Sequence, residues 1–266
     1  MIDLPPSVNP APPHHLESAS GPSIAYHRSG TKSPGVVFMG GFMSDMTGVK
    51  ASALEAWARA RGQAFLRFDY RGHGASAGRF EDGTIGLWAE DALAVFDALS
   101  DGPQILIGSS MGAWIALLTA LQRLERVVGF VGIAPALDFT EDLMWARFTP
   151  AAREALLRDG IYYQPSQYGE KPYPITHRLI EEARQHFLMQ GPIPFARPVR
   201  ILHGMQDPDV PWQRSLKLAE CLVARDVRIV LIKDGDHRLS RPDDLALLCR
   251  NVEALCQTPH FATGLE

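Results

Sequence analysis

Residues 101–124 read DGPQILIGSSMGAWIALLTALQRL, and the fold class of the chain follows from this stretch. No charge occurs between Asp101 and Arg123, a length that could span a bilayer. Its middle, however, is Gly108-Ser109-Ser110-Met111-Gly112, whose two glycines suit a sharp turn. We therefore predict a buried strand over 104–107, a tight turn at Ser110 and a buried helix over 111–124, rather than a transmembrane segment.

Short apolar runs with strand character alternate with helical runs on both sides of this stretch. The other expected strands are 23–27, 36–39, 64–68, 127–133, 199–203 and 227–232, and the other expected helices are 50–61, 87–99 and 243–255. This alternation is typical of a mostly parallel central sheet with helices on both faces. The sequence thus predicts an α/β protein.

We expect a single domain over residues 1–266 with two additions. Segment 137–198 lies between two expected strands and holds two helical stretches around a loop rich in Tyr, Pro and Gly, so we interpret it as a small inserted cap. Residues 1–15 are rich in proline and are expected to form a mobile arm. The arm has neither the features of a secretory signal nor the arginines of a mitochondrial transit peptide.

The composition is that of a soluble globular protein. Hydrophobic residues make up 46% and charged residues 21% of the 266 residues, and the formal net charge is -4. Lysine and arginine do not cluster, so we expect neither nucleic acid nor an anionic membrane as a partner. The 3 cysteines suit small apolar packing positions rather than a disulfide framework, which favours a reducing compartment. We expect a cytoplasmic protein, with the mitochondrial matrix as the alternative for a processed form.

The motif G-x-S-x-G places Ser110 at a turn between a strand and a helix, where a nucleophilic serine is exposed. The adjacent helix N-terminus favours negative charge that develops there. The candidate base is His237, because it follows the last expected strand directly. A carboxylate between these two positions would complete the order Ser, Asp, His that is typical of the α/β-hydrolase fold.

The loop after strand 199–203 offers two carboxylates, of which we favour Asp207 because it comes first after the strand. We expect Asp209, further along the same loop, to face water. Asp138, after the preceding strand, is a further candidate. His203, at a strand end, is interpreted as a hydrogen-bonded structural residue rather than as the base.

Gly40-Gly41-Phe42-Met43 follows the strand 36–39, where hydrolases of this fold place an oxyanion donor. We assign the oxyanion hole to the backbone N–H groups of Phe42 and Met111, although the glycine pair also fits an ordinary flexible turn. No dinucleotide loop, phosphate loop or zinc spacing is present. We therefore predict no cofactor and no metal.

Several segments together resemble a known family, the α/β-hydrolase-domain proteins that include the mitochondrial palmitoyl-protein thioesterase, also described as an acyl-glucuronide esterase. The segments are 41–51 (GFMSDMTGVKA), 67–70 (RFDY), 101–112 (DGPQILIGSSMG), 192–194 (PIP), 203–212 (HGMQDPDVPW) and 236–238 (DHR). The resemblance implies Ser110, Asp207 and His237 as the catalytic triad. The sequence departs from the family in two ways. It lacks the family's transit peptide, which suggests a bacterial-type cytoplasmic relative or a processed form. Its loop Arg71-Gly72-His73-Gly74 differs from the family's and leaves the substrate preference open.

From the residues and the resemblance, we expect a serine hydrolase that cleaves thioesters or esters of small acyl conjugates, such as acyl glucuronides, or of S-acylated proteins. An acyltransferase or a carbon–carbon hydrolase could use the same triad, and a non-catalytic binding scaffold is a third reading. The cap is expected to cover the acyl pocket, and the candidate lining residues are Leu143, Met144, Trp145, Phe148 and Tyr162. Each of these could instead pack the cap onto the sheet.

Overall fold

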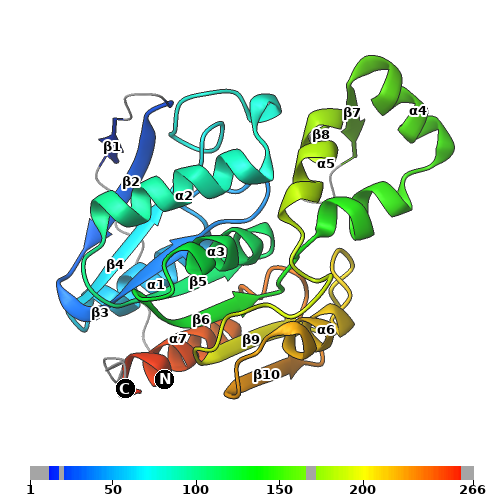
Figure 1. Ribbon diagram of the computed structural model, residues 1–266. Helices are drawn as coiled ribbons and strands as arrows, with labels where there is room; N and C mark the ends of the chain where they lie inside the picture. Colours follow the sequence, from blue (N-terminus) through cyan, green and yellow to red (C-terminus); the bar gives the residue numbers. More distant parts are fainter. Residues whose placement is uncertain (1–11, 18–20, 166–171, 259–266) are drawn as a thin grey trace.

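An eight-stranded sheet forms the centre of the computed structural model, which describes residues 12–17, 21–165 and 172–258 (Figure 1). The strand order is β1-β2-β4-β3-β5-β6-β9-β10. The pairs β1–β2 and β2–β4 are antiparallel and the other neighbours are parallel, which confirms the predicted mostly parallel sheet. The strands are β1 (His14–Leu16), β2 (Ile24–Ser29), β3 (Lys32–Met39), β4 (Gln63–Phe68), β5 (Gln104–Ser109), β6 (Val127–Ile133), β9 (Val199–Gly204) and β10 (Val227–Ile232).

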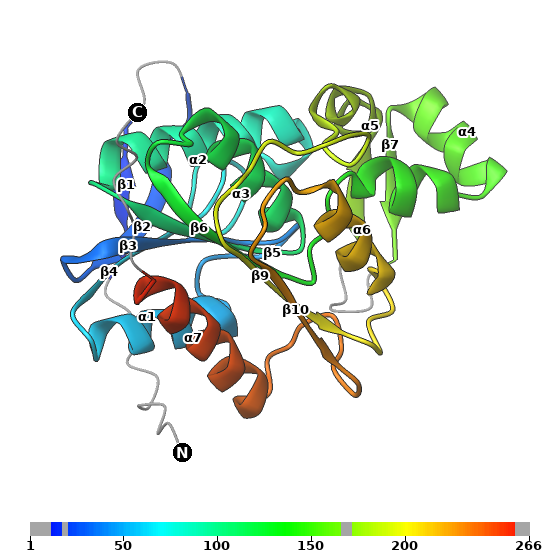
Figure 2. The same cartoon turned by 60° about the horizontal axis from the view of Figure 1, so that its bottom comes forward.

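Helices cover both faces of the sheet, as predicted (Figure 2). One face carries α1 (Val49–Arg59) and α7 (Pro242–Cys256), and the other carries α2 (Ile85–Leu99), α3 (Met111–Gln122) and α6 (Gln213–Cys221). In β5, Ile105 and Ile107 pack in the core under α1 and α7, while Leu106 packs in the core under α2 and α3. A strand that is buried on both faces is apolar at every position, which explains its uninterrupted run of apolar residues.

The uncharged stretch forms β5 and α3 with a turn between them, in agreement with the prediction. Nine of the helix side chains, including Trp114 and Leu117, are buried between the sheet and its neighbours. Such a helix is apolar all round because it has no face toward water. Within the described ranges, every helix is too short or too polar to cross a membrane.

The chain leaves the sheet after β6 and returns at β9, and the segment between them lies beyond one end of the sheet (Figure 1). It contains a π-helical turn (Thr140–Met144), a 3-10 turn (Trp145–Arg147), α4 (Pro150–Asp159), β7 (Ile161–Gln164), β8 (Tyr173–Thr176) and α5 (His177–Ala183). The antiparallel hairpin of β7 and β8 replaces the loop that we expected. Its strands have 4 residues each and β8 contains Pro174, which an edge strand tolerates but which hides the strand signal.

One strand of the central sheet, β1, was not expected. Most of the predicted mobile arm 1–15 lies outside the described residues, but its end belongs to β1, where His14 pairs with Tyr26 of β2. A strand of 3 residues carries no readable periodicity. The prediction of a mobile arm is therefore wrong for His14 and His15.

Candidate active site

Ser110 is the single residue between β5 and α3, and its backbone is strained. It has φ 55° and ψ -120°, a conformation that residues other than glycine rarely adopt. Three hydrogen bonds hold it there: its amide donates to the Ile133 carbonyl over 2.8 Å, and its carbonyl accepts from the amides of Ala113 and Ala136 over 3.0 and 3.2 Å. The sharp turn directs the side chain away from the helix axis and leaves it half-buried at the carboxyl end of β5.

The two glycines of the motif allow this turn to pack tightly. A Cβ atom on Gly108 would overlap the backbone of Ala113 at the start of α3. A Cβ atom on Gly112 would overlap the Met39 carbonyl oxygen at the end of β3. The motif is therefore required by the close approach of β3, β5 and α3, independently of any chemistry.

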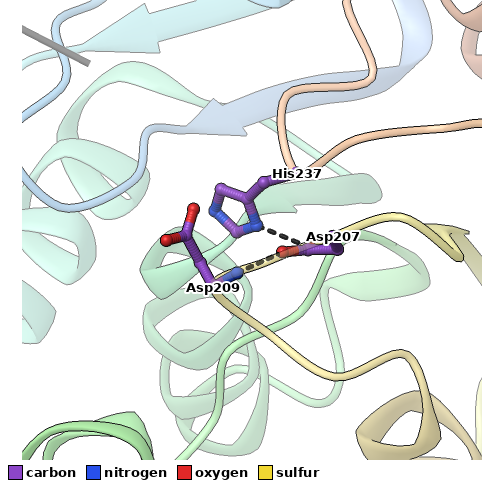
Figure 3. Close-up of side chains that lie close together, drawn as sticks. All are labelled: Asp207, Asp209 and His237. Atoms are coloured by element: carbon purple, nitrogen blue, oxygen red, sulfur yellow. Dashed lines mark hydrogen bonds and ion pairs between the residues drawn. The ribbon is translucent and has the colours of Figure 1, made fainter. Parts of the chain in front are cut away.

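The side chains of Ser110, His237 and Asp207 form one hydrogen-bonded series. His237 Nε2 lies 3.1 Å from Ser110 Oγ. His237 Nδ1 lies 2.7 Å from Asp207 Oδ2, a bond drawn in Figure 3. Because a carboxylate can only accept hydrogen bonds, Nδ1 of the neutral His237 ring carries the hydrogen. The lone pair of Nε2 therefore faces the Ser110 hydroxyl. The three residues come from the carboxyl ends of β5, β9 and β10, where parallel α/β sheets hold their sites. The geometry suits general-base activation of Ser110, and the catalytic role itself stays a prediction.

Asp207 is held by four donors, and its side chain is 0% exposed. Oδ1 accepts from the amides of Asp209 and Val210, each over 2.9 Å, and Oδ2 accepts from His237 and from His203 Nε2 at 3.2 Å. Burial alone would raise the pKa of this carboxyl group. The hydrogen bonds from His203 and His237 outweigh burial and hold the pKa well below its usual range. The carboxylate is therefore ionised at neutral pH.

The expectation that Asp209 faces water is wrong. It is half-buried, and its carboxylate lies beside the His237 ring and lines the cavity described below (Figure 3). The turn that lets its amide bond to Asp207 brings its side chain back over the histidine. The other candidate, Asp138, accepts from the amides of Leu188 and Met189 at 3.0 and 2.8 Å. It fixes the chain that returns from the cap, and burial raises its pKa.

One group with metal-type donors occurs within the described ranges, and it consists of Asp207, Asp209 and His237. Their nearest ligand atoms lie within 4.8 Å of one another. However, Asp207 and His237 already use one another as hydrogen-bond partners. The group therefore fits the series with Ser110 better than it fits an ion.

The predicted oxyanion donors border Ser110. A Cβ atom on Gly41 would lie 3.4 Å from Ser110 Cβ, so the loop after β3 passes directly beside the serine. In the described part of the chain, the amides of Phe42 and Met111 donate to no protein acceptor. Met111 also begins α3, where the helix dipole favours an anion. The Phe42 ring anchors the loop through edge-on contacts with Phe80, Trp88, Phe139 and Tyr173 at 4.9–6.0 Å.

A cavity of about 620 Å³ opens at Ser110 and His237 under the cap. Leu143, Met144 and Phe148 line it, as expected. Trp145 and Tyr162 do not, so their assignment to the pocket is wrong.

Both misassigned rings pack within the cap instead. The Trp145 ring has the guanidinium groups of Arg153 and Arg184 at 5.2 and 5.8 Å. The Tyr162 ring packs edge-on against Phe148 at 5.5 Å. These contacts lie within the cap and do not join it to the sheet, so they differ from the alternative that we considered as well.

The sequence reasoning missed the polar part of the cavity lining. These residues are Ser44, Asp45, Thr47, Lys50, Arg147, Gln164, Asp209, Arg238 and Ser240. Lys50 Nζ donates to the Arg238 carbonyl at 2.6 Å, and burial, followed by the charge of Arg238, lowers the pKa of Lys50 to about 8. No signal identified Lys50, because a lysine in the first turn of a helix resembles any solvated lysine.

The family model described as "Alpha/beta hydrolase family" matches residues 36–246. The curated relatives include the mouse protein named "Palmitoyl-protein thioesterase ABHD10, mitochondrial", which is 42% identical over 241 residues, covering 90% of this chain and 81% of the relative. The human protein of the same name is 40% identical over 235 residues, covering 88% and 76%.

Two solved structures are also similar. The mouse alpha/beta hydrolase domain-containing protein 10 has a TM-score of 0.85 at 39% identity, covering 92% of this chain and 98% of that one. A putative hydrolase from Agrobacterium vitis S4 has a TM-score of 0.88 at 42% identity, covering 93% and 100%. Both likenesses confirm the predicted fold.

The predicted cytoplasmic location is contradicted by these comparisons, because the names of the mouse and human relatives state that they are mitochondrial. The prediction rested on the cysteines and on the lack of a transit-peptide pattern in residues 1–15. A reducing matrix and a reducing cytoplasm place the same demands on cysteines, so these do not separate the two compartments.

Proposed function

The chain belongs to the alpha/beta hydrolase family, and from this membership we propose that it cleaves carboxylic thioesters and esters through an acyl-enzyme on Ser110. One observation carries the proposal: the series Ser110 Oγ, His237 and Asp207 opens into a cavity of about 620 Å³. A nucleophile, a base and an orienting carboxylate are the parts that acyl transfer to serine requires.

In the first half of the reaction, Ser110 Oγ attacks the acyl carbon while His237 Nε2 takes the serine proton. The Asp207 carboxylate holds the ring by its Nδ1–H and stabilises the imidazolium. The amides of Phe42 and Met111 donate to the oxyanion of the tetrahedral intermediate. The intermediate collapses, the C–S or C–O bond breaks, and His237 returns its proton to the leaving thiol or alcohol.

The second half repeats these steps with water. His237 takes a proton from the water as its oxygen attacks the acyl carbon of the Ser110 ester. The same two amides hold the second oxyanion, and the Ser110 oxygen leaves with the proton from His237. The products are the carboxylic acid and free enzyme.

The proposed substrates are S-acyl thioesters, palmitoyl among them, because the relatives are named palmitoyl-protein thioesterases. The cavity size lies within the roughly 300–1,000 Å³ of ordinary ligand sites. Its apolar part, Phe42, Phe139, Leu143, Met144 and Phe148, suits a hydrocarbon chain. Small acyl conjugates with a polar leaving group, such as acyl glucuronides, form the second proposed class, which the polar lining with Lys50 and Arg238 favours.

Steady-state kinetics on an S-palmitoyl peptide, a palmitoyl oxygen ester and an acyl glucuronide test the proposal. We expect hydrolysis by the wild type and a loss of at least about 10⁴-fold in kcat for Ser110→Ala, by analogy with a serine protease that loses about 10⁶-fold. Added alcohol acceptors should not divert the product, whereas an acyltransferase would form new esters. Wild-type turnover by folded Ser110→Ala, or no hydrolysis of any of the three, would contradict the proposal.

A further inference from the structure

His203 is a buried histidine that touches the proposed catalytic carboxylate. It lies near the end of β9 and is 0% exposed. Its Nε2 is 3.0 Å from the Val210 carbonyl oxygen and 3.2 Å from Asp207 Oδ2. Its Nδ1 is 2.6 Å from the hydroxyl of Ser215 on α6, which is also 0% exposed. The ring is thus hydrogen-bonded at both nitrogens.

The partners determine where the ring carries a hydrogen. Nε2 faces a carbonyl and a carboxylate, which only accept, so Nε2 carries a hydrogen in either protonation state of the ring. In the neutral ring, Nδ1 accepts the Ser215 hydroxyl hydrogen. The two acceptors at Nε2 therefore set the tautomer that donates toward Asp207, and the Ser215 hydroxyl fits that tautomer and orients the ring.

The hydrogen bond from His203 Nε2 adds a second donor to Oδ2 of the Asp207 carboxylate. The amides of Asp209 and Val210 fix Oδ1, and in the described part of the chain His203 and His237 are the two donors to the other oxygen, Oδ2. His203 also ties the loop back to β9 by its bond to the Val210 carbonyl. Both bonds oppose rotation of the carboxylate away from His237 Nδ1.

We propose that His203 is a positioning residue: its Nε2–H, oriented by Ser215, holds the Asp207 carboxylate against His237. This inference rests on the proposed function, because the role of His203 exists only if Asp207 orients the base. His203 touches no reacting atom, so it acts on the reaction through Asp207. By sharing Oδ2 with His237, it also moderates the negative charge that Asp207 presents to the base.

Two substitutions at the same position separate a positioning role from packing. In His203→Gln, the amide nitrogen falls near the position of Nε2, so the donor to Asp207 is kept. In His203→Asn, the amide falls near Nδ1, and the donor is lost. Ser215→Ala keeps the ring and removes the hydrogen bond at Nδ1 that orients it.

We expect His203→Asn to lose about tenfold or more in kcat with KM within about twofold, because a hydrogen bond that orients a catalytic group without touching the substrate is lost. Its acid limb in the pH profile of kcat/KM should move to higher pH, because Asp207 then acts more fully on protonated His237. His203→Gln should stay within about threefold of wild-type kcat. Ser215→Ala should lose kcat several-fold, in the same direction as His203→Asn.

Equal losses in His203→Gln and His203→Asn with an unmoved acid limb, or full activity in His203→Asn, would overturn the proposal. If His203→Asn fails to fold by circular dichroism, Ser215→Ala decides: wild-type kcat and an unmoved acid limb there overturn it as well. Ser110→Ala and Asp207→Asn are measured alongside. Activity in those two variants would refute the proposed function, whereas their inactivity with active His203→Asn refutes only the role of His203.

Discussion

Asp207→Asn should inactivate the enzyme while the protein remains folded, because every partner of Asp207 is a donor. Two of these donors are backbone amides at Oδ1, and two are histidine nitrogens at Oδ2. An asparagine side chain has one oxygen and one NH₂ group, so the NH₂ group must face either the two backbone amides or the two histidine nitrogens. The backbone amides cannot change, whereas His237 can move its hydrogen from Nδ1 to Nε2. The variant then holds His237 in the tautomer that cannot accept the Ser110 proton.

The size of the effect follows from this tautomer change. The same substitution in a serine protease triad lowers kcat by about 10⁴-fold. That factor corresponds to about 5 kcal/mol of transition-state stabilisation. Loss of hydrogen bonds to a buried charge should also lower the free energy of unfolding by about 2–4 kcal/mol at neutral pH.

The stability difference between wild type and Asp207→Asn should depend on pH. Because the folded pKa of Asp207 is depressed, its contribution is fully present above the unfolded value of about 3.9. It is lost as the pH falls from there through the folded pKa, so the difference should shrink in acid. Urea unfolding at pH 7 and below pH 4 measures it.

Initial rates on an S-palmitoyl peptide, with circular dichroism as a check of folding, provide the assay. Asp209→Asn is the matched control, because its carboxylate lies beside His237, whereas the bond to His237 Nδ1 comes from Asp207 (Figure 3). We expect it to keep kcat within about tenfold of wild type. A folded Asp207→Asn within tenfold of wild type, or a more severe loss in Asp209→Asn, would refute the reasoning.

Three further predictions concern packing and charge. Gly112→Ala should lower the free energy of unfolding by about 1–3 kcal/mol or more in urea, because its Cβ would overlap a backbone carbonyl of β3; an unchanged midpoint would contradict the packing argument. Phe148→Ala should lower kcat/KM for palmitoyl thioesters by about tenfold and spare acetyl esters, whereas Tyr163→Ala, outside the cavity lining, should change neither; equal losses on both chain lengths would exclude an acyl contact. At pH 8, Lys50 should react with acetic anhydride faster than exposed Lys233 in peptide mass maps, because its pKa is lowered to about 8; slower labelling would show that the ammonium form persists.

The fold could be predicted from the sequence where segments buried on all sides appear as uninterrupted apolar runs. Residues 105–107 and the helix after Ser110 are apolar on every side, and they mark the centre of the sheet and its covering layer. The positions of Asp207 and His237 followed from their places after strands. Side chains at the carboxyl ends of parallel strands gather at one edge, so strand order alone brings them close.

The cap could not be predicted in this way. A π-helical turn over Thr140–Met144 adds a residue to the turn and changes which side chains face the cavity. Leu143 and Phe148 line it, while Trp145 turns toward two arginines. No periodicity of 3.6 residues contains that information.

The polar details of the site were also hidden, because they depend on contacts between distant segments. His203 was expected to be a hydrogen-bonded structural residue, but its bond to Ser215 depends on how α6 packs on the sheet. The bond from Lys50 to the Arg238 carbonyl joins α1 to the loop after β10. Such pairs have no spacing along the chain that could identify them.

The formation of an acyl-enzyme on Ser110 is tested most directly by covalent labelling. Wild-type protein treated with a fluorophosphonate should gain one adduct by intact mass, and peptide mapping should place it on Ser110. Prior incubation with an S-palmitoyl substrate should slow the labelling, and Ser110→Ala should gain no adduct. An adduct on another residue, or equal labelling of folded Ser110→Ala, would contradict the account.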